Sequence, residues 1–143
     1  MVGGARIKDW KAGGHGQQTF LEVLQNSCNP GFMEIGFRLG TTKLYDYIHR
    51  YGFGEKTGID LLGESTGIVF KENRVGPVEL ATSSFGQGNS TTPIQLTSAM
   101  SAAINGGNLM KPYVLKRIKN EADDIIFENV PAIKRKVISD KTS

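Results

Sequence analysis

Ser27 and Asn29 are the two residues whose types and spacing most clearly suggest chemistry. They flank Cys28 in the stretch Asn26-Ser27-Cys28-Asn29-Pro30, between two expected helices. A hydroxyl and an amide two residues apart in a bend can face one cleft, where the hydroxyl relays a proton and the amide contacts a carbonyl and an amine. The alternative is a serine in a turn followed by an asparagine that caps a helix. A match of three residues does not decide between these interpretations.

Asp9, His15 and Cys28 form a second set of chemically suggestive residues. They offer oxygen, nitrogen and sulfur donors within 20 residues. Such a mixture suits zinc, with a fourth position left for water or another part of the chain. The alternatives are a histidine that makes hydrogen bonds within its loop and a small buried cysteine. We therefore treat a structural zinc site here as a hypothesis, and we expect no cofactor to be required for chemistry.

Other signals exclude several classes of protein. Lys56-Thr57-Gly58 is similar to a catalytic tripeptide of serine acyltransferases, but it follows Gly-Phe-Gly and precedes Ile-Asp-Leu, so we interpret it as a loop and reject a catalytic role. A single cysteine excludes an internal disulfide. A dispersed net charge of +3 does not favour nucleic acid, and no run of about 18 apolar residues predicts a membrane span.

The sequence predicts a helical region that positions these residues. The 143 residues suit one domain, which we divide into a Gly-rich loop (1–18), a helical part (19–110) and a strand-rich tail (111–143). Capping residues, prolines and apolar stripes predict helices over 19–26, 30–39, 41–51, 77–83 and 93–106. Alternating apolar residues predict strands over 113–118 and 124–128, with a further edge segment over 134–138.

Two packing expectations accompany these elements. In the helix over 41–51 we expect Leu44, Tyr47 and Ile48 to face inward. The helix over 93–106 is apolar nearly all round, which predicts burial at the centre of the domain.

An ordered series of short motifs resembles one known family. The matching stretches are 13–18 (GGHGQQ), 24–30 (LQNSCNP), 51–60 (YGFGEKTGID), 74–79 (RVGPVE), 85–95 (FGQGNSTTPIQ) and 102–107 (AAINGG). Together they resemble the transpeptidase domain of class B penicillin-binding proteins, and most closely the sporulation-specific type, from residue 2 to about residue 143. The resemblance implies an α+β fold: the helix-rich part of the penicillin-binding protein/β-lactamase-like transpeptidase fold, with a few short strands near the C-terminus.

The family has three active-site motifs, and the resemblance places Ser27 and Asn29 in the second, Ser-x-Asn. No Ser-x-x-Lys, the motif that holds the nucleophile, occurs in these 143 residues. Lys56-Thr57-Gly58 is not the third motif of the family, because it matches a different stretch of the family's sequence. We therefore expect a middle segment of the domain that is inactive alone.

The resemblance implies a serine D,D-transpeptidase as the parent, which cross-links peptidoglycan stem peptides and is acylated by β-lactams, in spore cortex synthesis. It implies action at the extracytoplasmic face of the cell membrane, with the anchor outside this segment. Helices without their usual sheet expose apolar faces, so we expect either self-association or support by a metal. The open alternative is a zinc-stabilised binding module without catalysis.

Overall fold

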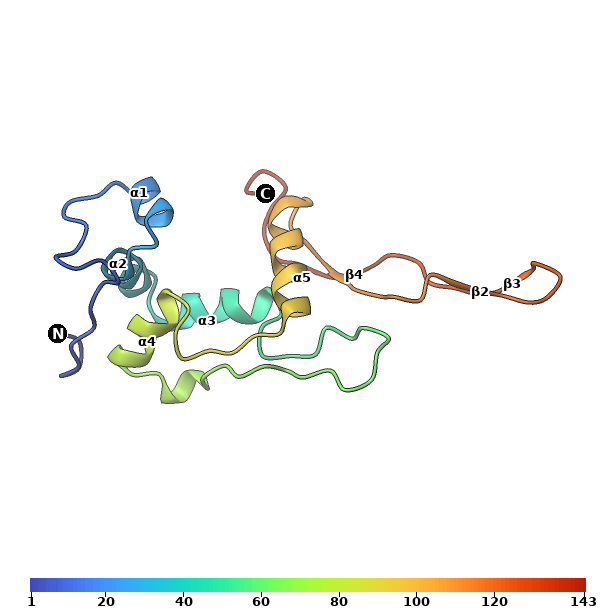
Figure 1. Cartoon of the computed structure of the whole chain (residues 1–143), viewed down its shortest axis with the longest axis horizontal. Coiled ribbons are helices and arrows are strands. Elements are labelled where there is room, and N and C mark those ends of the chain that lie inside the picture. The colour runs from blue at the N-terminus through green and yellow to red at the C-terminus, as the bar shows by residue number, and fades with distance from the viewer. The chain divides into compact units, whose positions relative to one another are not determined.

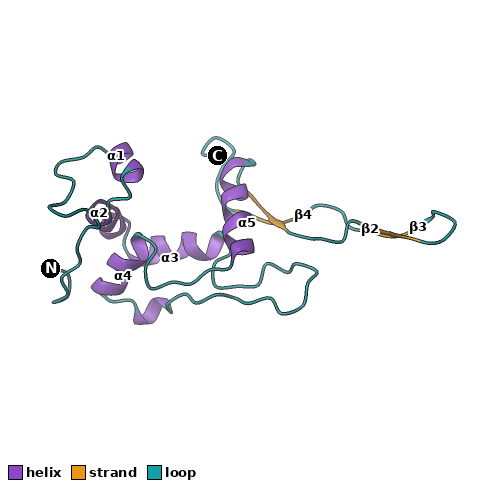
Figure 2. Ribbon diagram, viewed as in Figure 1, coloured by secondary structure: helices purple, strands orange, loops and turns teal.

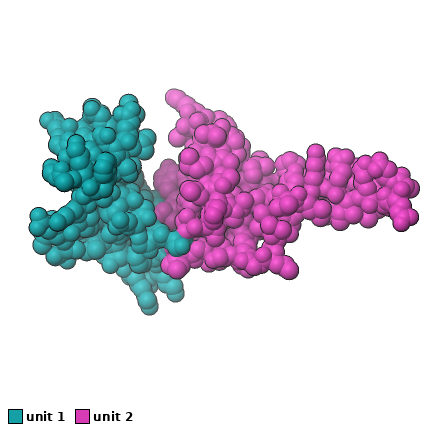
Figure 3. All heavy atoms as spheres, viewed as in Figure 1, with its two compact units in different colours: residues 1–46, 69–90 teal, residues 47–68, 91–143 magenta.

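The computed structural model describes residues 1–143, with five α-helices followed by four short strands (Figures 1 and 2). The helices are α1 (Phe20–Gln25), α2 (Asn29–Leu39), α3 (Thr41–Arg50), α4 (Pro77–Ser84) and α5 (Pro93–Ile104), with a 3-10 helix at Glu72–Arg74. The strands are β1 (Asn108–Lys111), β2 (Arg117–Lys119), β3 (Ile125–Glu128) and β4 (Ala132–Lys136). The chain forms two compact units, residues 1–46 with 69–90 and residues 47–68 with 91–143 (Figure 3). This mixture of helices and short strands confirms the α+β class.

Helix starts follow the capping chemistry of the sequence. Thr19 caps α1 by accepting from the Glu22 N–H, and Glu22 returns a bond to the Thr19 N–H at 2.7 Å. Thr92 and Gln95 make the same reciprocal pair at the start of α5. These pairs satisfy N–H groups that have no partner inside a helix, which is why the helix starts are readable from sequence.

In the first unit, α2 packs against α4 and α1. Gly36 of α2 lies so close to α4 that a Cβ at this position would be 2.5 Å from the Cβ of Ser84. Tyr45 of α3 is fully buried, and its hydroxyl lies 3.2 Å from the Ser83 hydroxyl of α4. Our prediction for Tyr47 is wrong, since 41% of this residue is exposed. The protected stripe of α3 contains residues 41, 44, 45 and 48, which share one helix face, and Tyr47 lies off it.

In the second unit, α5 packs against β1, and β1 pairs antiparallel with β4. Ala102, Leu109 and Val137 form the buried core of this unit. β1 was not predicted from the sequence, and β4 lies at Ala132–Lys136 rather than at the predicted 134–138. Four residues are too few to show an alternating pattern.

The helix α5 is buried on one face only. Gln95, Ala99 and Ala102 are buried, whereas Leu96, Met100 and Ile104 are 52%, 62% and 82% exposed. The exposed residues are spaced by four and form a separate stripe. The prediction that this helix is buried at the centre of the domain is therefore wrong for this chain.

β2 and β3 form a separate antiparallel hairpin. β2 is shorter than the predicted strand over 113–118, because the N–H groups of Val114 and Leu115 donate to the Asp60 carboxylate at 2.7 and 2.8 Å. None of the helices is both long enough and apolar enough to cross a bilayer.

Candidate functional site

The Ser27 and Asn29 pair lies in an elbow between α1 and α2, as the sequence predicts. Helix α1 ends at Gln25 and α2 begins at Asn29, so no continuous helix passes through. Ser27 has a φ of 47°, in the left-handed region that interrupts a helix. One detail differs: the N-cap is Cys28, without a side-chain bond, and Asn29 is the first helical residue rather than the cap.

The Asn29 side chain is held by the N-terminal loop. Its Nδ2 donates to the Lys8 carbonyl at 3.2 Å, and its backbone N–H donates to Asp9 Oδ1 at 3.4 Å. Asn29 is not the cap of α2, because the helix already includes it and the capping position falls to Cys28. One N–H and the amide oxygen of Asn29 remain for other partners. Ser27 is exposed.

A hollow of about 390 Å³ opens beside this elbow. Cys28 and Pro30 line it, together with residues of the preceding loop, of α1 and of α2, but Ser27 and Asn29 do not. This hollow is therefore not the groove that we expect Ser27 and Asn29 to share, and that groove stays a prediction.

The structure brings Asp9, His15 and Cys28 together. Their potential ligand atoms all lie within 4.8 Å of one another. His15 Nδ1 lies 2.5 Å from Asp9 Oδ2, and the Cys28 thiol donates to the same oxygen at 3.5 Å. The side chains of Asp9 and His15 are only 5% and 6% exposed, and Cys28 is buried. The three residues thus form a compact cluster of mixed donors, which joins the N-terminal loop to the elbow through Cys28.

The cluster and the neighbouring backbone stabilise the ionised form of Asp9. Burial raises the pKa of this carboxyl, but hydrogen bonds from His15, Cys28 and the N–H groups of Trp10 and Asn29 outweigh burial and hold it below its usual value. Asp9 therefore carries negative charge at neutral pH. A carboxylate, an imidazole and a thiol in contact can hold a cation or share protons.

Trp10 is a contact of the elbow that sequence reasoning missed. Its indole Nε1 donates to the Asn26 carbonyl at 2.8 Å, and its ring meets the His15 ring edge-on, with centroids 5.3 Å apart. A single tryptophan in a Gly-rich loop next to Asp9 was the available signal. Nothing in the spacing shows that it reaches a residue 16 positions further on.

Lys56-Thr57-Gly58 lies in a loop, in agreement with its rejection as a catalytic strand. The Thr57 N–H and hydroxyl both donate to Glu64 Oε1 at 2.5 Å, and the Gly58 N–H donates to Oε2 at 3.1 Å. Thr57 is buried, and its hydroxyl is already used as a donor. It therefore closes a loop and offers no nucleophile.

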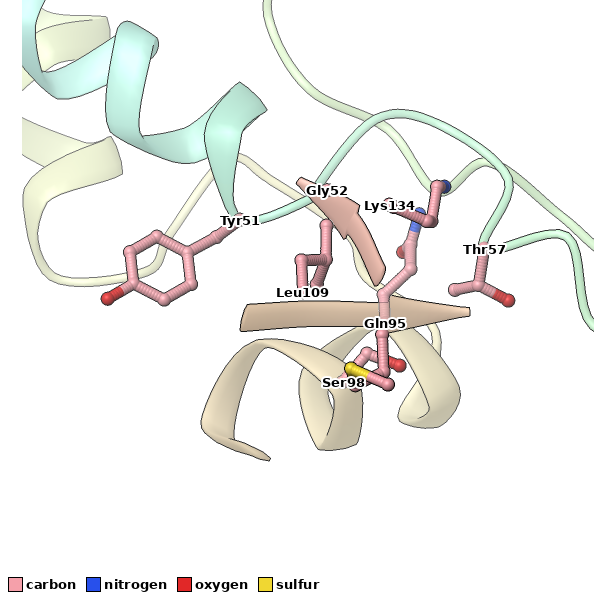
Figure 4. A pocket seen from close by; sticks show the side chains of 8 residues that line it. Tyr51, Gly52, Thr57, Gln95, Ser98, Leu109 and Lys134 are labelled. Atoms are coloured by element: carbon pink, nitrogen blue, oxygen red, sulfur yellow. The ribbon is translucent and has the colours of Figure 1, made fainter. Parts of the chain in front are cut away.

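The second unit contains a small pocket next to this loop (Figure 4). It is lined by Tyr51, Gly52, Thr57, Gln95, Ser98, Leu109, Met110 and Lys134. Its volume of about 10 Å³ is close to that of a single water site, so it is a packing gap in the core and not a substrate site.

Known proteins match most or all of the chain. Residues 1–143 match the family described as "Penicillin binding protein transpeptidase domain". The chain is 58% identical over 143 residues to "Stage V sporulation protein D" of Bacillus subtilis, and 31% identical over 119 residues to "Peptidoglycan D,D-transpeptidase MrdA" of Escherichia coli. These matches cover 99% and 77% of this chain, and 22% and 19% of the relatives.

Solved structures agree with the sequence matches. The structure of penicillin binding protein 3 from Mycobacterium tuberculosis superposes with a TM-score of 0.87 at 29% identity, covering 99% of this chain and 31% of that one. The D,D-transpeptidase domain from Eggerthella lenta, at 21% identity, shares the fold with a TM-score of 0.91, over 99% of this chain and 38% of that domain's chain. The chain thus spans about a fifth of the length of the two curated relatives described above. With the family pattern covering all 143 residues, the chain belongs to the transpeptidase family of penicillin-binding proteins.

Proposed function

We propose that this chain forms part of a serine D,D-transpeptidase that cross-links peptidoglycan stem peptides, and that it contributes the Ser-x-Asn motif through Ser27 and Asn29. The observation that carries the proposal is the elbow itself, which presents an exposed hydroxyl and a side-chain amide from the break between α1 and α2. The 58% identity to a sporulation protein supports a role in building the spore cortex.

The proposed reaction is an acyl transfer in two steps. A serine hydroxyl attacks the carbonyl carbon of the D-Ala-D-Ala bond, the C–N bond breaks, and D-Ala leaves with the serine proton on its amine. An amine of a neighbouring stem then attacks the acyl-enzyme, forms the new amide and returns a proton to the serine. Ser27 relays the proton in both steps, and Asn29 holds the substrate amide with its remaining donor and acceptor.

The sequence determines how this proposal is tested. Because these residues contain no Ser-x-x-Lys, the 143-residue chain should not be labelled covalently by a fluorescent penicillin, whereas the full-length protein that carries it should be labelled. The full-length protein should also release D-Ala from a pentapeptide stem. Labelling of the isolated chain, or no labelling of the full-length protein, would overturn the proposal.

We further propose that the full-length protein acts at the extracytoplasmic face of the cell membrane. Its curated relatives include peptidoglycan D,D-transpeptidases, and the substrate implied by that name lies outside the cytoplasm. A fusion to a reporter active only outside the cytoplasm tests this location. Activity of a cytoplasm-specific reporter at the same junction would contradict it.

For the cluster under the elbow, we propose that Asp9, His15 and Cys28 hold a zinc ion. The convergence of an oxygen, a nitrogen and a sulfur donor within 4.8 Å supports this. Donors on one tetrahedral zinc lie about 3.3–3.6 Å apart. The Cys28–Asp9 separation of 3.5 Å fits that value, and the 2.5 Å His15–Asp9 hydrogen bond must open by about 1 Å. Bound zinc would act as a structural cross-link between the N-terminal loop and the elbow.

Metal content and thermal stability test the zinc proposal. We expect about one zinc per chain by elemental analysis and a lower Tm after chelation. Cys28→Ser should lose the metal, whereas His49→Ser, outside the cluster, should keep it. A metal-free chain whose Tm does not respond to a chelator would contradict the proposal.

We also propose that the isolated chain self-associates. Phe20, Leu21 and Leu24 of α1 are 60–72% exposed, which concentrates apolar surface on one short helix. Light scattering over a concentration series should show dimers or larger species, and Leu24→Lys should reduce them. A monomer at all concentrations would contradict this expectation.

A further inference from the structure

We infer that Trp10 is a positioning residue for the Ser-x-Asn elbow and that it acts through its indole N–H. The inference rests on the proposed function for its catalytic meaning, although its structural part can be tested separately. Neither Ser27 nor Asn29 touches Trp10 through a side-chain hydrogen bond. The connection runs through the backbone of Asn26.

The first observation is the target of the indole. Trp10 Nε1 donates at 2.8 Å to the carbonyl of Asn26, which belongs to the peptide bond that joins Asn26 to Ser27. The direction of this carbonyl fixes the plane of the peptide and therefore limits the φ of Ser27. A donor on this oxygen acts directly on the residue that should relay protons.

The second observation is the strained backbone conformation of Ser27. Ser27 has a φ of 47°, which is unfavourable for a residue with a Cβ. Such a conformation persists only where the surroundings fix it. The Ser27 N–H donates to the Leu24 carbonyl and the Cys28 N–H to the Val23 carbonyl, which fixes the peptides of the turn from the α1 side. The indole fixes the Asn26 carbonyl from the N-terminal loop.

The third observation is that Trp10 is mostly exposed, so its effect on the elbow comes from its hydrogen bond rather than from the packing of its ring. Trp10 is 65% exposed, so the burial of its ring contributes little. Its ring also meets the His15 ring edge-on. The residues before it hold the other end of the elbow, since Lys8 and Asp9 accept from Asn29. The segment 8–10 thus contacts the elbow on both sides of Ser27, at the Asn26 carbonyl and at Asn29.

Replacing Trp10 by Phe tests the inference, because Phe keeps an aromatic ring and removes the N–H. In the full-length transpeptidase, Trp10→Phe should lower the second-order rate constant of acylation by penicillin about threefold to tenfold, the range for one lost hydrogen bond, with Tm nearly unchanged. The matched control is Asn129→Ala, which removes another exposed side-chain bond to a backbone carbonyl, from Asn129 Nδ2 to Leu115 at 2.7 Å. The control should acylate at the wild-type rate.

A structural readout on the 143-residue chain does not depend on catalysis. The HN–Hα coupling and the Cα and Cβ shifts of Ser27 report its φ, and in Trp10→Phe they should move away from left-handed values. Wild-type acylation and unchanged Ser27 signals in Trp10→Phe would overturn the inference. If the unmodified full-length protein is not acylated at all, the proposed function fails instead, and the Ser27 signals alone decide whether Trp10 holds the elbow.

Discussion

Gly31→Ala tests the packing of α2 against α1 next to the elbow. Gly31 lies in the first turn of α2, and a Cβ there would be 2.6 Å from both γ-carbons of Val23, the buried residue of α1. Ordinary contacts at such a position are 3.4–4 Å. Val23 is β-branched and cannot turn away easily, so α1 must shift. Overpacking of this kind costs about 1–3 kcal/mol, and the helix propensity of alanine returns less than about 1 kcal/mol at a helix end.

We therefore expect Gly31→Ala to destabilise the chain by about 1–2 kcal/mol in urea unfolding. The matched control is the double variant Gly31→Ala with Val23→Ala, because Val23→Ala makes room for the new methyl group. Val23→Ala alone should lower the free energy of unfolding by about 1.6 kcal/mol through lost apolar burial. The double variant should be more stable than the sum of the single changes predicts. If Gly31→Ala stabilises the protein, α1 and α2 do not pack as described.

Three further predictions concern the rest of the fold. The N–H groups that donate to Asp60 hold its pKa below the usual value, so the stability that this carboxylate contributes is present at neutral pH and is lost as pH falls below about 4. The protection of the Leu115 amide, measured as its exchange rate relative to the intrinsic rate at the same pH, should fall with it, and in Asp60→Asn this protection should be reduced at every pH. Gln95→Leu should cost about 2 kcal/mol in urea unfolding, because the buried Gln95 amide donates to two loop carbonyls at 2.7 and 2.8 Å, and an unchanged midpoint would refute that role. Tyr45→Phe should lower the free energy of unfolding by about 1 kcal/mol, because it removes the hydrogen bond to Ser83. The double variant Tyr45→Phe, Ser83→Ala should lose less stability than the sum of the two single variants, which would show that the two residues are coupled.

Helices were predictable where local chemistry determines them. The Thr19 and Thr92 capping pairs and the prolines that begin α4 and α5 act within one turn, so their signals are contained in a few neighbouring residues. The strands were harder, because β1 exists through pairing with β4, more than 20 residues away. The shortened β2 follows from a long-range contact to Asp60 that no local pattern contains.

The candidate site shows the same division. The elbow at Ser27 and Asn29 was predictable from Pro30 and the flanking apolar stripes. Its assignment to the Ser-x-Asn motif came from the resemblance of an ordered series of motifs to the family. The capping role given to Asn29 was wrong, because α2 begins at Asn29 itself and the capping position falls to Cys28. The convergence of the predicted metal ligands and the reach of Trp10 depend on how the loop folds back, which spacing alone does not determine.

The most direct test of the central claim is the second-order rate constant for acylation of the full-length transpeptidase by a fluorescent penicillin after Ser27→Ala. The control is Ser101→Ala, at an exposed position of α5. A proton relay in the reaction predicts a loss of about 100-fold or more for Ser27→Ala, with an unchanged Tm, and the wild-type rate for Ser101→Ala. Wild-type acylation by Ser27→Ala would contradict the claim that this elbow serves the chemistry.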